Sequence, residues 1–402
     1  MDEQPKISFE PPRGMRDFYP EDMVWRNRVF DAFRAAGEAA GFEPYDACVV
    51  ESYELLARKA GEEVGEQIYH FRDKSDRHIA LRAEMTPTLA RMVAQRQGSL
   101  AFPIKWTTIA QCFRYERMTK GRKREHYQWN CDIIGEESVL AEVEVLGAAC
   151  DALRRMGLSR DDFRVHVSNR ALLSELLAAS GIPADLHAQV FLALDKRGKM
   201  PDEEIAAMLR DGGVDDAGVK AAFAIMDLKT LDEAEHLAGA GSPAVAQLRE
   251  LFRLAGLAGF ADCLVFDISV IRGLSYYTGI VFECFDTQRE FRAIFGGGRY
   301  DNLLTTIGGD PATAGAEEHR LRAGTRPRAR KELLRLRLAE REVHAFPLRA
   351  QLRRELQRRV ALLGEHPPHV HALLRACGRG STSASRTPGR PTPSVRRTRA
   401  CG

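Results

Sequence analysis

The sequence lacks several features that would place it in a common class of protein. No two of its eight cysteines have Cys-x-x-Cys spacing, which argues against a zinc site. No apolar run is long enough to span a bilayer, and the polar start Met1–Lys6 is not that of a signal peptide. The P-loop pattern Gly-x-x-x-x-Gly-Lys-[Ser/Thr] is also missing. These absences predict a cytoplasmic protein with no membrane segment, with buried free thiols and with no metal site that can be assigned.

Acidic and basic residues are unevenly distributed along the 402 residues. Residues 315–402 contain 20 arginines and one lysine against seven glutamates, whereas residues 1–314 contain 38 Lys and Arg against 49 Asp and Glu. The small overall charge of +3 therefore combines an acidic body with a strongly basic tail.

The tail also lacks residue types that folded domains use. It has no Asp, Asn, Ile, Met, Tyr or Trp, and a packed core needs β-branched and aromatic side chains. Its abundant Arg, Ala, Gly and Pro have GC-rich codons, so the composition favours a frameshift near Ala314. The alternative is a genuine basic tail that binds RNA electrostatically. We predict disorder for this tail under either hypothesis.

Hydrophobic spacing predicts a mixed α+β fold for the acidic body. Helical patterns occur at 21–41 and 87–97, the second with Thr86 as its N-cap, and at 136–156. Alternating patterns at 106–113 and 126–134 predict two strands joined by a basic loop.

The same patterns divide the chain into three parts. Residues 183–260 carry only helical patterns, which predicts a helical insertion, and strand patterns return after it. We therefore expect a core of residues 1–182 and 261–314, an insertion at 183–260 and a separate tail at 315–402.

The densest group of polar residues lies on the predicted strand pair. Arg114 and Glu116 stand at the end of the first strand, and Gln128, Asn130 and Asp132 share one face of the second. A fixed arginine suits contact with a phosphate group. The alternative is a solvated hairpin tip, but here polar residues fill positions that a buried face would give to apolar ones. The pattern favours binding of a polyanion such as ATP or the end of an RNA.

Three further groups are less specific. Arg272, Tyr276 and Tyr277 precede a predicted strand, where they could contact a polar ligand or simply fill a core. The segment Gly296-Gly-Gly-Arg-Tyr-Asp-Asn-Leu303 begins with three glycines, which predict a loop that allows close backbone approach to a ligand. Glu84 precedes a predicted helix, where the plain alternative is an interaction with the helix dipole.

Taken together and in this order, these segments resemble the catalytic domain of class II histidyl-tRNA synthetases. The resemblance runs from Pro12-Arg-Gly-Met-Arg-Asp-Phe-Tyr-Pro20 to about Ala314. Its most specific segments are Arg272-Gly-Leu-Ser-Tyr-Tyr-Thr-Gly279 and the hairpin that ends in Gln128-x-x-x-Asp132. It implies an α+β fold whose antiparallel sheet is flanked by helices, with a helical insertion. It also implies a homodimer that uses ATP with Mg²⁺ to attach L-histidine to tRNA(His).

The resemblance also implies a role for each matching residue. Arg114 and Arg272 would be catalytic cations at the α-phosphate of ATP, because negative charge builds up on its oxygens during attack by the histidine carboxylate. Glu116 would help these arginines to place the nucleotide. The residues implied to bind histidine are Glu84, Thr86 and Gln128 at its α-amino group, and Asp132, Tyr276 and Tyr277 around its imidazole ring.

The sequence departs from the family in three places, and the third is the serious one. An aspartate is usual where this chain has Ser275. Cys48 stands where the family usually has proline, in the first motif, which forms the dimer. After Ala314 the family continues into a Gly-Phe-Gly-rich strand, a helix with an arginine for the γ-phosphate and an anticodon-binding domain. This chain instead reads Gly315-Ala-Glu-Glu-His-Arg320. We therefore expect these parts to be absent and the chain as written to be inactive.

Two other functions remain open at this point. One is the regulatory subunit of ATP phosphoribosyltransferase, a paralogue without the anticodon-binding domain, although the presence of Arg272 argues against it. The other is a non-catalytic RNA-binding protein formed by a synthetase body and the arginine-rich tail.

Overall fold

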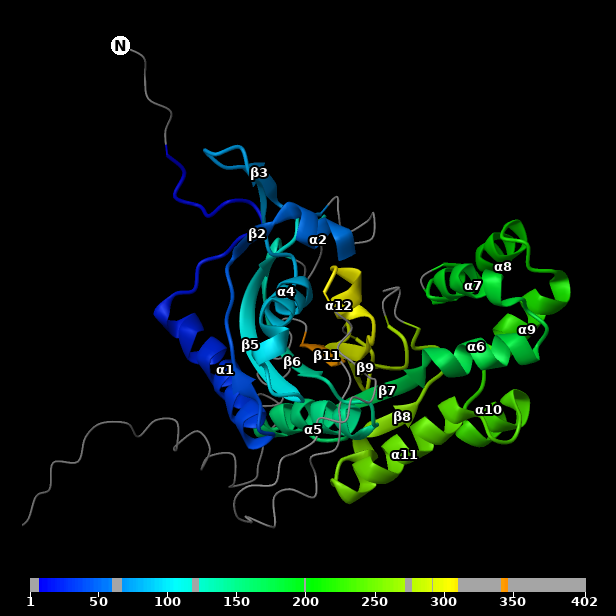
Figure 1. Ribbon diagram of the computed structural model, residues 1–402. Coiled ribbons are helices and arrows are strands. Elements are labelled where there is room, and N and C mark those ends of the chain that lie inside the picture. Colours follow the sequence, from blue (N-terminus) through cyan, green and yellow to red (C-terminus); the bar gives the residue numbers. More distant parts are fainter. Residues whose placement is uncertain are drawn as a thin grey trace, which may run out of the picture. The chain divides into compact units, whose positions relative to one another are not determined.

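The computed structural model describes residues 7–59, 67–117, 123–198, 200–271, 277–290 and 292–309, and the backbone of residues 341–345. These residues form two sheets and a set of helices (Figure 1). The mixed α+β fold and the largely antiparallel sheet expected from the sequence are confirmed.

The larger sheet has eight strands. In spatial order they are β1 (Glu43–Pro44), β5 (Ile104–Phe113), β6 (Glu125–Ile134), β11 (Arg341–Ala345), β10 (Phe295–Arg299), β9 (Ile280–Asp286), β7 (Phe163–Asn169) and β8 (Leu264–Phe266). The pairs β1–β5 and β7–β8 are parallel, and the others are antiparallel. A smaller sheet consists of β2 (Val50–Ser52), β4 (His78–Leu81) and β3 (His70–Arg72).

Helices of the described residues pack on these sheets and on one another. They are α1 (Pro20–Ala39), α2 (Tyr53–Lys59), α4 (Thr86–Arg96), α5 (Leu140–Arg155), α6 (Arg170–Ala179), α7 (His187–Leu194), α8 (Asp202–Asp211), α9 (Asp216–Met226), α10 (Leu231–Ala238), α11 (Pro243–Leu257) and α12 (Leu303–Thr306). Residues 183–260 contain helices and no described strand, as their pattern predicted. Their status as a separate domain stays a prediction.

Alternation along β6 gives the large sheet two different faces. On one face, Trp129 stacks on Phe33 of α1 with ring centroids 4.6 Å apart, and Cys131 belongs to the same apolar core. On the other face lie Gln128 and Asp132, which are 4% and 0% exposed. In Figure 1, α1 and α5 cover the first side of the sheet and α4 and α12 cover the second. The polar face of β6 is thus buried within the protein.

Several boundaries differ from the sequence-based predictions. Thr86 is the first residue of α4 and not its N-cap, because Met85 before it has helical dihedral angles (φ −93°, ψ −24°). The helix α5 begins at Leu140 and not at Glu136, because the Glu136 carboxylate accepts hydrogen bonds from the backbone N–H and hydroxyl of Ser138 and holds a turn there. Local side-chain hydrogen bonds of this kind compete with helix formation.

The glycine run also differs from its prediction as a loop. Gly296, Gly297 and Gly298 lie inside β10, between β11 and β9, and all three are buried. A Cβ atom on Gly298 would lie 2.8 Å from the ring of Tyr277. Position 298 therefore requires glycine, because the Tyr277 ring lies too close for any residue with a Cβ atom.

Five residues of the predicted tail take part in the sheet. The backbone of Arg341–Ala345 pairs with Trp129–Ile133 of β6 and with Phe295–Arg299 of β10. The prediction of disorder does not hold for these five residues. The rest of 315–402 lies outside the described residues.

Gly14 fixes the N-terminal segment against the strand pair β5–β6. Its φ of +92° is left-handed, and an added Cβ would lie 2.7 Å from Cγ of Arg124. Its carbonyl accepts a hydrogen bond from the backbone N–H of Arg124, whose guanidinium lies 3.6 Å from the ring centroid of Tyr115.

We expect Gly14→Ala to destabilise the protein by about 1–3 kcal/mol, because alanine is strained at this φ and collides with Arg124. The midpoint of urea unfolding measures the effect. Gly98→Ala is the matched control, because Gly98 has no atom within 4 Å of the added Cβ and no positive φ. An equal effect of the two substitutions would contradict this explanation.

Candidate functional site

The centre of the candidate site is a hydrogen bond between two fully buried side chains. The hydroxyl of Tyr300, which follows β10, donates to Oδ1 of Asp132 on β6 at 2.7 Å. Both residues are 0% exposed. Since β11 lies between β6 and β10, this bond joins two strands that are not neighbours in the sheet.

Tyr277 lies next to this pair. It precedes β9, is 3% exposed, and its ring meets that of Tyr300 edge to face with centroids 6.3 Å apart. Asp132 and Tyr277, both predicted to bind the imidazole ring, are therefore brought together by the fold with Tyr300 between them.

The residues predicted to bind the α-amino group lie on the same side of the sheet. Gln128 is the partner of Ala110 in the β5–β6 register, and Met85 packs against Ala110. Glu84 and Thr86 flank Met85, so the start of α4 lies over the face that carries Gln128. The chain segment that supplies a carboxylate and a hydroxyl thus packs on the strand pair that carries the Gln128 amide.

Arg114 and Glu116 lie just beyond the end of β5, not within the strand. The Nε of Arg114 donates to the carbonyl of Ala83 at 3.0 Å, and its Nη1 lies 4.0 Å from the Glu116 carboxylate. This contact places the guanidinium beside the segment that carries Glu84. The predicted phosphate cation and the predicted amino-group ligand are therefore neighbours.

Two predicted site residues, Arg272 and Tyr276, lie outside the described residues. Among the residues that the structure does describe, no group of three or more His, Cys, Asp or Glu is arranged to hold a metal ion. Within the same part of the chain, no helix has the length and apolarity needed to cross a bilayer.

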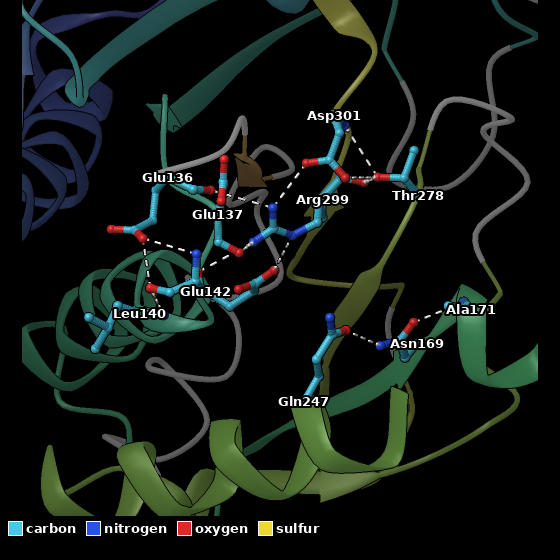
Figure 2. Close-up of polar contacts among 11 residues, drawn as sticks. Glu136, Glu137, Leu140, Glu142, Asn169, Ala171, Gln247, Thr278, Arg299 and Asp301 are labelled. Atoms are coloured by element: carbon cyan, nitrogen blue, oxygen red, sulfur yellow. Dashed lines mark hydrogen bonds and ion pairs between the residues drawn. The ribbon is translucent and has the colours of Figure 1, made fainter. Parts of the chain in front are cut away.

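The residues next to the two tyrosines, Thr278, Arg299 and Asp301, belong to a polar network (Figure 2). Arg299 contacts Glu142 of α5, Asp301 and the turn that starts at Glu136. Burial raises the pKa of Glu136 to about 7, although hydrogen bonds from Ser138 oppose the shift. This network joins the end of β10 to the connection between β6 and α5.

Tyr300 and Arg299 were not predicted from the sequence to belong to the candidate site. Both follow the glycine run, which was interpreted only in terms of backbone freedom. The available signal was the position of Arg299-Tyr300-Asp301 directly after a glycine run, where polar side chains can be held close to a ligand site.

Known proteins are similar in sequence to about three quarters of this chain. A family model for histidyl-tRNA synthetase matches residues 14–316. The chloroplastic/mitochondrial histidine–tRNA ligase of Arabidopsis thaliana is 47% identical over 305 residues, which are 76% of this chain and 63% of that enzyme. The histidine–tRNA ligase of Leptospira biflexa is 40% identical over 311 residues, which are 77% of this chain and 71% of that enzyme. The chain thus spans less than two thirds of the Arabidopsis relative.

Solved structures show the same fold. A structure titled ATP phosphoribosyltransferase regulatory subunit/histidyl-tRNA synthetase, from Bacillus halodurans, aligns with a TM-score of 0.69 at 21% identity, covering 85% of this chain and 82% of that one. Histidyl-tRNA synthetase from Nostoc aligns with a TM-score of 0.67 at 21% identity, covering 88% and 75%. These structures support the fold alone, whereas the family model and the sequence relatives establish descent. The chain belongs to the histidyl-tRNA synthetase family.

Proposed function

We propose that the body of this chain is the catalytic domain of a histidine–tRNA ligase. Such an enzyme activates L-histidine with ATP to histidyl-adenylate and transfers the histidyl group to tRNA(His). The observation that carries the proposal is the buried polar face of β6, with Asp132 held by Tyr300 at 2.7 Å. Buried polar side chains on a central strand are costly, and convergent polar groups in a buried site mark the binding of a polar ligand.

The imidazole ring of histidine fits the chemistry of this face. The Asp132 carboxylate would accept a hydrogen bond from one ring nitrogen, and the Tyr277 hydroxyl would pair with the other, with Tyr276 lining the pocket. Glu84, Thr86 and Gln128 would hold the α-amino group. Amino acids without two ring nitrogens would leave these buried groups unpaired, which is a strong basis for selectivity.

The activation step requires positive charge around the α-phosphate. When a histidine carboxylate oxygen attacks the α-phosphorus, the bond to pyrophosphate breaks and negative charge builds up on the phosphate oxygens. Arg114 and Arg272 would stabilise that charge, and Glu116 would help to place the nucleotide. We propose that Mg²⁺ takes part as the complex with ATP, since this cation is commonly held by substrate phosphates together with one or two carboxylates.

The family match ends at residue 316, 86 residues before the end of this sequence. We propose that residues 315–402 supply neither the γ-phosphate arginine nor an anticodon-binding domain. We keep the three-part division of core, helical insertion and tail as part of the same proposal. No described feature favours the regulatory-subunit or RNA-binding alternatives over the ligase.

We propose that the protein is a cytoplasmic homodimer. Near Cys48, in the segment that resembles the dimer-forming motif, Val49 and Val50 are 43% and 40% exposed in the single chain. Val24 on α1 is also exposed. Apolar side chains of this kind support a surface that a second copy covers.

Calorimetric titration of the full chain with amino acids tests the proposal. We expect L-histidine to bind, and glutamine and phenylalanine to bind at least about 100-fold more weakly, since neither has two ring nitrogens to pair with the site. Equal affinity for the three amino acids, or no binding of histidine, would contradict the proposed function.

A further inference from the structure

Arg299 ends β10 and directly precedes Tyr300, yet its guanidinium points away from the sheet into the connection between β6 and α5 (Figure 2). It donates to the backbone carbonyls of three consecutive residues, Glu136 at 3.4 Å, Glu137 at 2.6 Å and Ser138 at 3.3 Å. One side chain thus ties the end of β10 to the residues that follow β6.

The same guanidinium contacts two carboxylates. Its Nε lies 3.3 Å from Glu142 on the first turn of α5, and its Nη1 lies 2.9 Å from Asp301. The side chains of Arg299 and Glu142 are only 13% and 1% exposed. Because water is largely excluded from the Arg299–Glu142 pair, loss of Arg299 would leave the Glu142 carboxylate buried without its partner.

A second link runs from Arg299 to Tyr277 through Thr278. The backbone N–H of Thr278 donates to the carbonyl of Arg299 at 2.8 Å, and its hydroxyl donates to Asp301 at 2.6 Å. Thr278 directly follows Tyr277, while Arg299 and Asp301 stand on either side of Tyr300. Each tyrosine of the site is therefore adjacent in sequence to a residue of this network.

The packing around the network leaves little space for other positions. A Cβ atom on Gly279 would lie 2.9 Å from Cδ of Arg299, and one on Gly298 would lie 2.8 Å from the ring of Tyr277. The arginine stem and the tyrosine ring each fill a space that exists because the facing residue is glycine.

We propose that Arg299 is a positioning residue of the histidine site, which holds Tyr300 and Tyr277 at a fixed place relative to Asp132. The strand ladder alone does not do this, because β11 separates β6 from β10 and both tyrosines lie beyond the ends of their strands. The contacts of Arg299 go to the β6–α5 connection, to α5 and to Asp301, so it acts on histidine through the tyrosines. This inference rests on the proposed function for its ligand.

The test compares Arg299→Gln, Arg299→Lys and Thr278→Val with the original chain. Arg253→Gln is the control, since it removes an arginine that pairs with Glu250 on the exposed side of α11. Two measurements are made on each full-length protein. Hydrogen–deuterium exchange follows peptides that cover 277–284 and 298–304, and calorimetry gives the dissociation constants of histidine and ATP.

For Arg299→Gln we expect exchange in both peptides to rise about tenfold and histidine to bind about tenfold more weakly, which corresponds to about 1.4 kcal/mol. Exchange in 106–113 and the affinity for ATP should stay within about twofold, because Arg299 does not contact that strand or the Arg114 region. Arg299→Lys should recover part of the loss, since an ammonium can still pair with Glu142. Arg253→Gln should behave as the original chain.

Unchanged exchange in 277–284 and 298–304 would overturn the inference, and so would an equal rise in 106–113, which would indicate general destabilisation. If Arg299→Gln does not fold, Arg299→Lys decides, because it shortens the donor set but keeps the charge and should still raise exchange in the two peptides above that of Arg253→Gln. Thr278→Val tests the second link, since it removes the hydroxyl hydrogen bonds with Asp301 and with the carbonyl of Arg299. If the original chain binds no histidine, the proposed function fails, yet the exchange measurement still shows whether Arg299 holds the tyrosines.

Discussion

The substitution Asp132→Asn is expected to weaken histidine binding by roughly 30- to 100-fold, which corresponds to about 2–2.7 kcal/mol. Asparagine has the same shape and can still accept the hydrogen bond from Tyr300. It removes the negative charge, however, and turns one acceptor into an N–H donor that faces the donor on the imidazole ring. A charge-assisted hydrogen bond in a buried site is thereby replaced by a repulsive contact.

Calorimetric titration with histidine and with ATP measures whether Asp132→Asn weakens the binding of histidine alone. ATP affinity should remain within about twofold, because Asp132 lies away from the Arg114 region on the β5–β6 pair. Asp151→Asn is a matched control, since Asp151 is an exposed partner of Arg155 on α5. Histidine affinity that is the same in Asp132→Asn and in the control would remove Asp132 from the site.

The second large effect concerns catalysis by the chain as written. Histidine-dependent exchange of pyrophosphate into ATP is expected to be at least about 1000-fold slower than for the Leptospira biflexa relative, because loss of preorganised charge at a transferring phosphate costs about 100- to 1000-fold for each group. The sequence after Ala314 offers no Gly-Phe-Gly segment, and the strand that pairs β6 with β10 is Arg-Glu-Val-His-Ala.

The exchange assay separates a loss of the activation step from a loss of histidine binding. The two proteins are assayed side by side at saturating histidine and ATP, after calorimetry has shown that both bind histidine. Exchange within about tenfold of the relative would mean that the 315–402 segment supplies the missing charge in another way, and the proposed deficiency would be wrong.

The polar face of β6 could be predicted from sequence because strand alternation is a local property. Gln128 and Asp132 are four residues apart, so period two places them on one face whatever the rest of the fold does. The same reasoning found the β5–β6 pair, with both ends correct within two residues. Arg114 was identified from its place at a strand end, although it lies one residue beyond that end.

The contribution of Tyr300 could not be predicted in this way. Its contact with Asp132 joins residues 168 positions apart and depends on β11 lying between two other strands. The glycine run before it predicts a loop when read locally, because glycine disfavours strands. It forms a buried strand since Tyr277 packs against the place where a Cβ would be. The N-cap prediction at Thr86 was wrong by one residue, because the helix includes Thr86 and Met85 is its N-cap.

A crystal structure of the full chain with bound L-histidine would show whether the buried polar face of β6 is the histidine site. We expect the imidazole ring to lie on this face, with one ring nitrogen within hydrogen-bond distance of Asp132 and the other near the Tyr277 hydroxyl, while Tyr300 keeps its bond to Asp132. Histidine bound elsewhere on the chain, or bound here with its ring turned away from Asp132, would contradict this expectation.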